Sequence, residues 1–216
     1  MTRPLLLGHR GARASRQIPE NTLASFELCL KHGCDGFEFD VRQTADGQAV
    51  ICHDPVVRGM EIAQKSAAAL ALPALSEVLR SFAGRAFLDI ELKVAGLGRA
   101  TAGLLRTHPP QKGYVVSSFL PEVLTAIHEV DATIPAGLLC ENRDQLALWR
   151  ELPVEWVIPQ FKLADRELIE RIQDAGKKVM VWTVNDAETM RQFAEWGVDA
   201  IISDQTEQLA GSLSDL

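Results

Sequence analysis

Three acidic side chains stand near the carboxyl ends of strand-like runs in this sequence. Glu38 and Asp40 are two residues apart, so on a strand both side chains point to the same side, and Glu91 ends a later run. Two carboxylates on one inward face repel each other unless a cation or a proton lies between them. Three oxygen ligands suit Mg²⁺ or Ca²⁺ rather than a soft metal, so the pattern predicts a divalent-cation site. The alternative is a solvated strand end with ion pairs from Arg42 and Lys93.

Basic and aromatic side chains accompany these carboxylates. His9 and His53 stand at strand ends, and two histidines that titrate near neutrality can act as acid and base. The other interpretation of a lone histidine is a satisfied core or loop residue. Arg10 and Lys93 would be surface charges in isolation, but beside the histidines and carboxylates they predict a phosphate pocket. Trp182 lies on an apolar run and serves either as core or as the pocket's apolar wall.

The elements that position these residues follow a regular rhythm of short apolar runs and longer amphipathic stretches. A parallel sheet with helical crossovers produces this alternation. Eight strand-and-helix units predict a closed (β/α)8 TIM barrel, and the rival is an open doubly wound sheet. The eight strand-like runs are Leu5–Gly8, Phe37–Val41, Ala86–Glu91, Tyr114–Ser118, Ala136–Cys140, Glu155–Pro159, Val179–Val184 and Ala200–Ser203.

One further run, Ala49–His53, interrupts the rhythm because no helix separates it from Phe37–Val41. The Asp46-Gly47 pair between them is a strong signal for a two-residue hairpin turn. This segment is therefore predicted to be an antiparallel β-hairpin extension of the second strand. A turn at Asp46 and Gly47 would place Asp40 opposite His53.

Composition sets limits on the whole chain. Its 216 residues, 47% of them hydrophobic, predict one globular domain over residues 1–216. A net charge of −7 gives no general attraction to nucleic acid or to an anionic membrane. The apolar run near the N-terminus is only three leucines, too short for a signal peptide or a membrane span. The four cysteines form no CxxC pair, so we expect reduced thiols and a cytoplasmic protein without membrane insertion.

Taken in order, the motifs around these residues resemble the glycerophosphodiester phosphodiesterase family, in its bacterial cytoplasmic type. Any single block is weak, but the series spans nearly the whole chain. The blocks are Gly8-His9-Arg10-Gly11, Pro19-Glu20-Asn21-Thr22, Glu38-Phe39-Asp40-Val41, Thr44-Ala45-Asp46-Gly47, His53-Asp54, Ile90-Glu91-Leu92-Lys93, Ser117-Ser118-Phe119, Val181-Trp182-Thr183-Val184-Asn185 and Gly197-Val198-Asp199-Ala200-Ile201-Ile202-Ser203-Asp204.

The resemblance implies a TIM-barrel enzyme that hydrolyses a small-molecule substrate, a glycerophosphodiester, to sn-glycerol 3-phosphate and an alcohol. It implies metal ligation by Glu38, Asp40 and Glu91, acid–base roles for His9 and His53, and phosphate binding by Arg10 and Lys93. Glu20 and Asn21 fall in a motif that the family places near the site, which gives them a supporting role. The chain departs from the family between Pro55 and Pro73, where a larger insertion is usual, so a more open cleft is expected.

Three other classes of protein compete with this interpretation. A phosphodiesterase of intact lipids would need a membrane-facing apolar surface, and no basic amphipathic helix or exposed aromatic cluster stands out. A catalytically silent barrel that only binds a phosphorylated ligand would lack one of the histidines or carboxylates, and none is missing. An unrelated isomerase barrel would need a base, but not three carboxylates beside two histidines.

Overall fold

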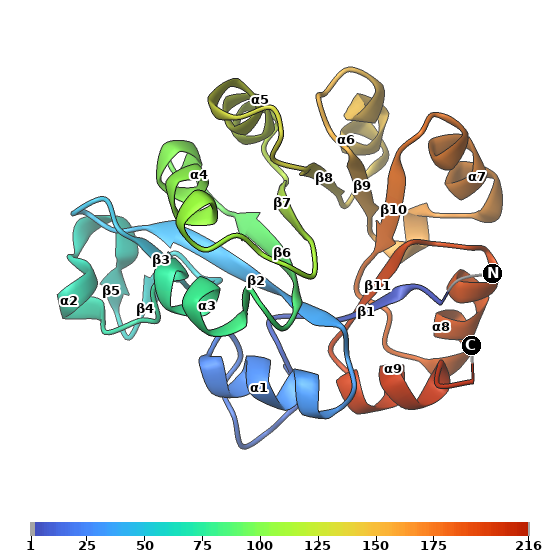
Figure 1. Ribbon diagram of the computed structural model, residues 1–216, viewed down its shortest axis with the longest axis horizontal. Coiled ribbons are helices and arrows are strands. Elements are labelled where there is room, and N and C mark those ends of the chain that lie inside the picture. Colours follow the sequence, from blue (N-terminus) through green and yellow to red (C-terminus); the bar gives the residue numbers. More distant parts are fainter. Residues whose placement is uncertain (1–2, 216) are drawn as a thin grey trace.

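Eight parallel strands close into a barrel in the computed structural model, which describes residues 3–215 (Figure 1). The barrel strands are β1 (Leu5–Gly8), β2 (Gly36–Gln43), β6 (Phe87–Leu92), β7 (Tyr114–Ser118), β8 (Ala136–Cys140), β9 (Trp156–Pro159), β10 (Lys178–Val181) and β11 (Ala200–Ser203). Closure is made by β1, where Gly8 pairs with Ser203 of β11 on one side and with Phe37 of β2 on the other. The predicted TIM barrel is therefore confirmed, because an open sheet would leave two unpaired edges.

A helix follows each barrel strand and packs on the outside of the ring (Figure 1). Several begin at a side-chain cap: the Thr22 hydroxyl accepts from the Ser25 N–H at the start of α1, and Asp186 caps α8 in the same way. The outer helices are α1 (Leu23–Lys31), α3 (Leu75–Phe82), α4 (Gly98–Thr107), α5 (Pro121–Val130), α6 (Arg143–Ala147), α7 (Arg166–Asp174), α8 (Ala187–Glu195) and α9 (Thr206–Ser212). Within residues 3–215, no helix combines the length and the apolar character needed to cross a membrane.

The barrel interior is filled by apolar side chains at every second strand position. Leu7, Val115, Leu139, Ile158 and Met180 belong to this inner cluster and are at most 3% exposed. Because strand side chains alternate between the two faces, the next inward positions toward the carboxyl ends lie above this apolar layer. Those positions carry the polar residues of the candidate site.

The hairpin extension exists, but its predicted register is wrong by one residue. Strand β3 (Ala49–Ile51) is antiparallel to β2 with Val41 opposite Ile51, and the Cys52 N–H donates to the Asp40 carbonyl at 3.0 Å. Asp40 is therefore opposite Cys52 and not His53. The loop has three residues instead of two, because the Thr44 N–H still bonds the Gln48 carbonyl and Gly47 takes the left-handed conformation (φ 76°).

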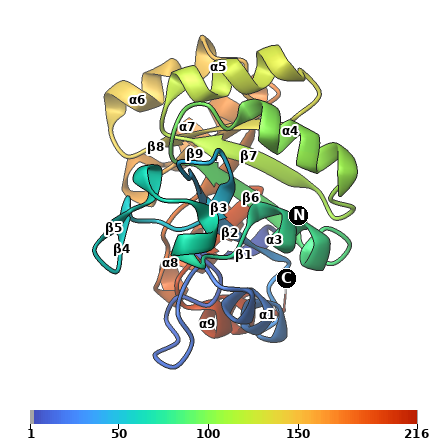
Figure 2. The same ribbon diagram turned by 90° about the vertical axis from the view of Figure 1, so that its left-hand side faces the viewer.

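A small structure that the sequence analysis did not predict follows β3 and projects at one end of the molecule (Figures 1 and 2). It contains the two-residue strands β4 (Val56–Val57) and β5 (Met60–Glu61), the 3-10 turn Ile62–Gln64 and the short helix α2 (Ala67–Leu70). Val50, Ile62 and Leu70 form its own minor core, and Arg58 donates to the Leu70 carbonyl. This segment occupies the stretch in which the sequence departs from the pattern of the family that it resembles.

Candidate active site

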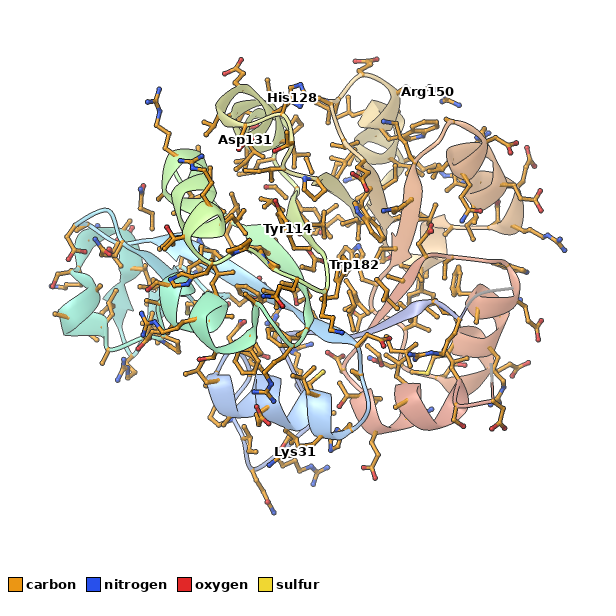
Figure 3. The ribbon with its side chains drawn as sticks, viewed as in Figure 1. Lys31, Tyr114, His128, Asp131, Arg150 and Trp182 are labelled. Atoms are coloured by element: carbon orange, nitrogen blue, oxygen red, sulfur yellow. The ribbon has the colours of Figure 1, made fainter. Side chains whose placement is uncertain are left out.

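A cavity of about 300 Å³ opens at the carboxyl ends of the barrel strands. Trp182 marks it near the centre of the ring of strands, whereas His128 lies on the outer helix α5 and Arg150 on the 3-10 turn Leu148–Arg150 that follows α6 (Figure 3). The cavity is lined by His9, Arg10, Glu38, His53, Glu91, Lys93, Phe119, Leu139, Glu141, Trp182 and Ile202. A larger hollow of about 740 Å³ lies beside α4 and α5, but none of the predicted site residues lines it.

The three predicted metal ligands lie together. Glu38, Asp40 and Glu91 are buried, and each offers a carboxylate oxygen within 4.8 Å of the other two. Register explains the grouping, because β2 and β6 are parallel neighbours with Asp40 opposite Glu91. Glu38 Oε2 accepts the Arg10 backbone N–H at 2.9 Å, while Glu38 Oε1 is buried without a hydrogen-bond partner among the described residues.

Burial and mutual repulsion act on the protonation of these acids. Burial, followed by the charges of Asp40 and Glu91, raises the pKa of Glu38 well above its usual range. Burial and the Asp40 charge raise the pKa of Glu91 to about 7, against the opposing effect of Lys93. Asp40 differs: its burial is outweighed by Lys93 and Arg10, which lower its pKa. The cluster therefore holds protons near neutral pH when no cation replaces them.

A fourth acid, Asp89, lies on the same inward face of β6, two residues before Glu91. It is fully buried, and Ser117 donates to its Oδ1 at 2.6 Å. Burial raises the pKa of Asp89 to about 7, although the Ser117 hydrogen bond lowers it. Asp89 does not line the cavity. It lies opposite Glu38 on the neighbouring strand, and its charge, when it is ionised, helps to raise the pKa values of Glu38 and Glu91.

Lys93 joins two of the carboxylates. Its Nζ lies 2.7 Å from Glu91 Oε1 and 3.2 Å from Asp40 Oδ1. Burial, which lowers the pKa of a lysine, is outweighed by these two charges, so the pKa of Lys93 is raised. The ammonium group therefore stays charged at the edge of the cavity.

Arg10 is presented by a sharp turn directly after β1. Arg10 itself has φ 52° and Gly11 has φ 80°, and a Cβ at Gly11 would lie 2.5 Å from Ser25 Oγ, so only glycine fits. Arg10 Nη1 donates to Glu20 Oε1 at 2.7 Å, and Arg13 Nε donates to Glu20 Oε2 at 2.6 Å. Glu20 thus holds Arg10 from behind and does not line the cavity.

Asn21 supports Asp40 in a comparable way. Its Nδ2 donates to Asp40 Oδ2 at 2.8 Å, and its Oδ1 accepts the Asp40 backbone N–H at 3.3 Å. The Asn21 N–H donates in turn to the Arg10 carbonyl at 3.0 Å. Asn21 therefore ties the turn after β1 to the carboxylate on β2.

Each histidine of the cavity has a carboxylate at Nδ1. His9 Nδ1 lies 2.7 Å from Asp204 Oδ1, and its Nε2 lies 3.9 Å from Glu38 Oε2. His53 Nδ1 lies 2.8 Å from Asp54 Oδ1, but this pair is more exposed, with side chains 35% and 74% accessible against 14% and 17% for His9 and Asp204. Both rings can therefore point Nε2 away from their carboxylate partners.

Asp204 is a functional candidate that stands in the last of the motifs quoted from the sequence, but no role was predicted for it. It follows the last barrel strand, and Asn185 Nδ2 and Arg13 Nη1 donate to it at 2.8 and 3.2 Å. Its burial is outweighed by the hydrogen bond and charge of His9 and by Asn185 and Arg13, so its pKa is lowered. Barrel closure brings Asp204 to His9, and no local sequence signal connects the two residues.

The remaining wall of the cavity is mostly apolar. Phe119 and Trp182 pack edge to face, with ring centroids 5.5 Å apart and planes 80° apart, and the Trp182 Nε1–H donates to the Ile158 carbonyl at 3.0 Å. Leu139 and Ile202 continue this surface. Glu141 also lies here and carries a charge that the sequence analysis did not consider.

Comparison with known proteins decides the family. The model of the "Glycerophosphoryl diester phosphodiesterase family" matches residues 9–95 and 96–208. The chain belongs to this family. A glycerophosphodiester phosphodiesterase from Caldanaerobacter subterraneus is 27% identical over 95% of this chain and 96% of its own length.

Solved structures give the same fold for the family. A putative glycerophosphoryl diester phosphodiesterase from Silicibacter pomeroyi superposes with a TM-score of 0.88, at 24% identity, over 99% of this chain and 94% of that one. An Oleispira antarctica phosphodiesterase in complex with the product sn-glycerol 3-phosphate has a TM-score of 0.86, at 25% identity, over 98% and 97% of the two chains. The predicted family and the predicted enzyme class, a phosphoric diester hydrolase, are confirmed.

Proposed function

We propose that this chain hydrolyses glycerophosphodiesters to sn-glycerol 3-phosphate and an alcohol with the help of Mg²⁺ or Ca²⁺. The observation that carries the proposal is one cavity lined by two histidines, an arginine, a lysine and two members of a buried carboxylate triad, Glu38 and Glu91. The named Caldanaerobacter relative and the product bound to the Oleispira enzyme support this class of substrate.

The carboxylates fit a hard divalent cation. Glu38 Oε1 is buried without a hydrogen-bond partner among residues 3–215, and the charges of the three acids oppose one another. Oxygen ligands of this kind, close together and partly open to a cavity, suit Mg²⁺ or Ca²⁺. When bound by Glu38, Asp40 and Glu91, such an ion would supply Lewis-acid polarisation and neutralise charge on the phosphate.

Arg10 and Lys93 are proposed to bind the phosphate. Both line the cavity, and both are held by carboxylates, Arg10 by Glu20 and Lys93 by Glu91. Donors fixed in this way need little rearrangement when negative charge develops on the phosphoryl oxygens. Glu20 and Asn21 act as supports that fix the positions of Arg10 and Asp40.

His9 is proposed as the general base. With its Nδ1–H donated to an ionised Asp204, His9 Nε2 carries a lone pair on the side of Glu38. It can take the proton of the attacking oxygen, whether that oxygen belongs to water or to the neighbouring hydroxyl of the substrate glycerol.

His53 is proposed as the general acid. Its more exposed ring, paired with Asp54, lies at the cavity and can give a proton to the leaving alkoxide. The two histidines thus hold opposite proton-transfer roles on the two oxygens of the phosphodiester.

Single histidine substitutions test this proposal. We expect His9→Ala and His53→Ala each to lower the release of glycerol 3-phosphate at least roughly a hundredfold, with circular dichroism and cation binding unchanged. His128→Ala, on the exposed face of α5, is the matched control and should keep full activity. Near-normal turnover by either cavity variant would refute its assignment.

The wider setting follows from charge and cysteine content. The net charge of −7 and four free cysteines, three of them buried, support a cytoplasmic enzyme of small molecules that does not bind nucleic acid. We propose that residues 1–216 belong to one catalytic domain.

A further inference from the structure

Glu141 is an acidic residue of the cavity wall that the proposed hydrolysis leaves without a role. It follows β8, and the alternation of strand side chains places Glu141 on the same inward side as Leu139. Its backbone is held in place, because the Glu141 N–H donates to Gln145 Oε1 at 2.9 Å and Asn142 caps α6 through the Gln145 N–H. The carboxylate is therefore presented to the cavity from a fixed loop.

Charge on the two sides of the cavity differs. The phosphate-binding and metal-binding candidates all come from β1, β2, β6 and the hairpin, where Lys93 pairs with Glu91 and Asp40 and a bound divalent cation would neutralise the remaining charge of the carboxylates. Glu141 stands on the opposite, apolar side, and its carboxylate forms no ion pair with a basic side chain of the described chain. A cation brought by the substrate would find an unmatched negative charge here.

Trp182 lies at the same level of the barrel as Glu141, whereas its partner Phe119 is level with Leu139, one inward layer lower. Cys140 pairs with Pro159 of β9, and Gln160 bridges to Trp182, so Glu141 and Trp182 are level and two strands apart. At a strand spacing of about 4.8 Å this separates their backbones by roughly 10 Å, room for a small ammonium group between the two side chains. Aromatic faces attract alkylammonium ions. The Phe119 ring already has Lys93 Nζ 5.8 Å from its centroid, so Trp182, level with Glu141, is the aromatic surface for a cation of the substrate.

We propose that Glu141, together with Phe119 and Trp182, selects glycerophosphodiesters whose alcohol carries an ammonium group, such as choline or ethanolamine, over esters of neutral alcohols. The inference rests on the proposed function, which puts the phosphate between Arg10 and Lys93 and leaves the apolar side for the alcohol. The attraction acts on a part of the substrate that does not react, so it is equal in the ground and transition states. It therefore lowers KM and leaves kcat unchanged.

The test compares four substrates, the glycerophosphodiesters of choline, ethanolamine, glycerol and inositol, with wild-type protein and Glu141→Gln. We expect Glu141→Gln to raise KM for the choline and ethanolamine esters roughly tenfold, as for one ion pair reinforced by an aromatic face, with kcat unchanged. KM for the two neutral esters should stay within about twofold of wild type. Glu167→Gln, an exposed change on α7, is the control and should alter none of the four.

Charge reversal gives a second variant: Glu141→Lys should raise KM for the cationic esters further than Glu141→Gln does. Unchanged KM values in both variants, or equal changes for all four esters, would overturn the selectivity. Normal hydrolysis of the neutral esters by Glu141→Gln shows that the catalytic site is intact. The neutral esters therefore distinguish a loss of selectivity from a loss of catalysis. If wild-type protein cleaves none of the four, the proposed function itself is overturned, and the selectivity falls with it.

Discussion

His9 Nδ1 lies 2.7 Å from Asp204 Oδ1, although 195 residues separate them in the chain. The contact exists because β1 and β11 are neighbours where the barrel closes, with Gly8 paired to Ser203. Asn185 and Arg13 donate to the same carboxylate, so Asp204 has one orientation and stays ionised. A fixed, ionised acceptor at Nδ1 keeps the proton on that nitrogen and leaves Nε2 basic.

Removing the charge of Asp204 should therefore impair catalysis without unfolding the protein. We expect Asp204→Asn to lower kcat on the order of a hundredfold, because an amide can stabilise the wrong imidazole tautomer and cannot stabilise imidazolium. The pH–rate profile should change along with kcat, which a purely structural role would not produce. Asp54→Asn is the comparison: because Asp54 is 74% exposed, its loss should cost less. A wild-type kcat in Asp204→Asn would contradict the proposed action of Asp204 on His9.

Binding of Mg²⁺ or Ca²⁺ should weaken as the pH falls. Burial raises the pKa of Glu91 to about 7, and burial also raises the pKa of Glu38, so protons occupy these ligands in the metal-free protein below neutrality. A cation must displace those protons, so affinity is lost as the pH drops below about 7 and levels off above the raised pKa values. Calorimetry in two buffers with different ionisation enthalpies measures the protons released. Affinity that is independent of pH, or that rises on acidification, would contradict this.

Asp89→Asn should stabilise the metal-free protein at alkaline pH. Burial raises the pKa of Asp89 from 3.8 to about 7, so the folded state binds its proton more tightly than the unfolded state. The free energy of unfolding therefore falls as the pH rises from about 4 to 7, because the buried carboxyl must give up its proton. A neutral amide at this position avoids that loss.

The gain for Asp89→Asn is bounded by about 4 kcal/mol, and relaxation of the site makes about 2 kcal/mol the expected value. This corresponds to a rise of about 5 °C in Tm at pH 8 and little or none at pH 4. Thermal melts in chelator across that pH range measure it. A gain that is larger in acid than in base would contradict the sign.

Two glycines with similar backbone angles should respond differently to alanine. Gly11 and Gly47 have φ of 80° and 76°, but a Cβ at Gly11 would lie 2.5 Å from Ser25 Oγ, whereas at Gly47 it would meet nothing within 4 Å. Gly47→Ala should cost about 1 kcal/mol of unfolding free energy from backbone strain alone.

Gly11→Ala should lower the free energy of unfolding several times more than Gly47→Ala does. It should also lower activity, because the turn at Gly11 presents Arg10 to the cavity. Urea unfolding and turnover measure the two effects. Equal costs for both glycines would show that the contact with Ser25 is relieved without consequence.

The fold could be predicted closely from the sequence because each barrel strand is a short apolar run. Tyr114–Ser118 and Ala136–Cys140, for example, have the bounds that the runs predicted. The hairpin register could not be predicted, because Asp46-Gly47 is compatible both with a two-residue turn and with a three-residue loop in which Gly47 is left-handed. Strands β4 and β5 have only two residues each, too few for a pattern.

For the candidate site, residue types and strand ends were enough to bring together seven of the cavity residues, from His9 to Trp182. No role was predicted for Asp204 or for Glu141, for different reasons. Asp204 acts through a partner at the other end of the chain, which only barrel closure reveals. In the sequence Glu141 resembles an ordinary surface charge, and its side chain is exposed. Only the structure shows that it lies above Leu139 in the wall of the cavity.

Release of sn-glycerol 3-phosphate from a glycerophosphodiester, before and after chelation, tests the central claim most directly. Wild-type protein treated with EDTA and freed of it should release essentially none, and adding Mg²⁺ or Ca²⁺ should restore the rate. Glu38→Gln should stay inactive with either cation, because Glu38 offers one of the three grouped carboxylate oxygens. Full release of glycerol 3-phosphate in the presence of chelator would contradict the account.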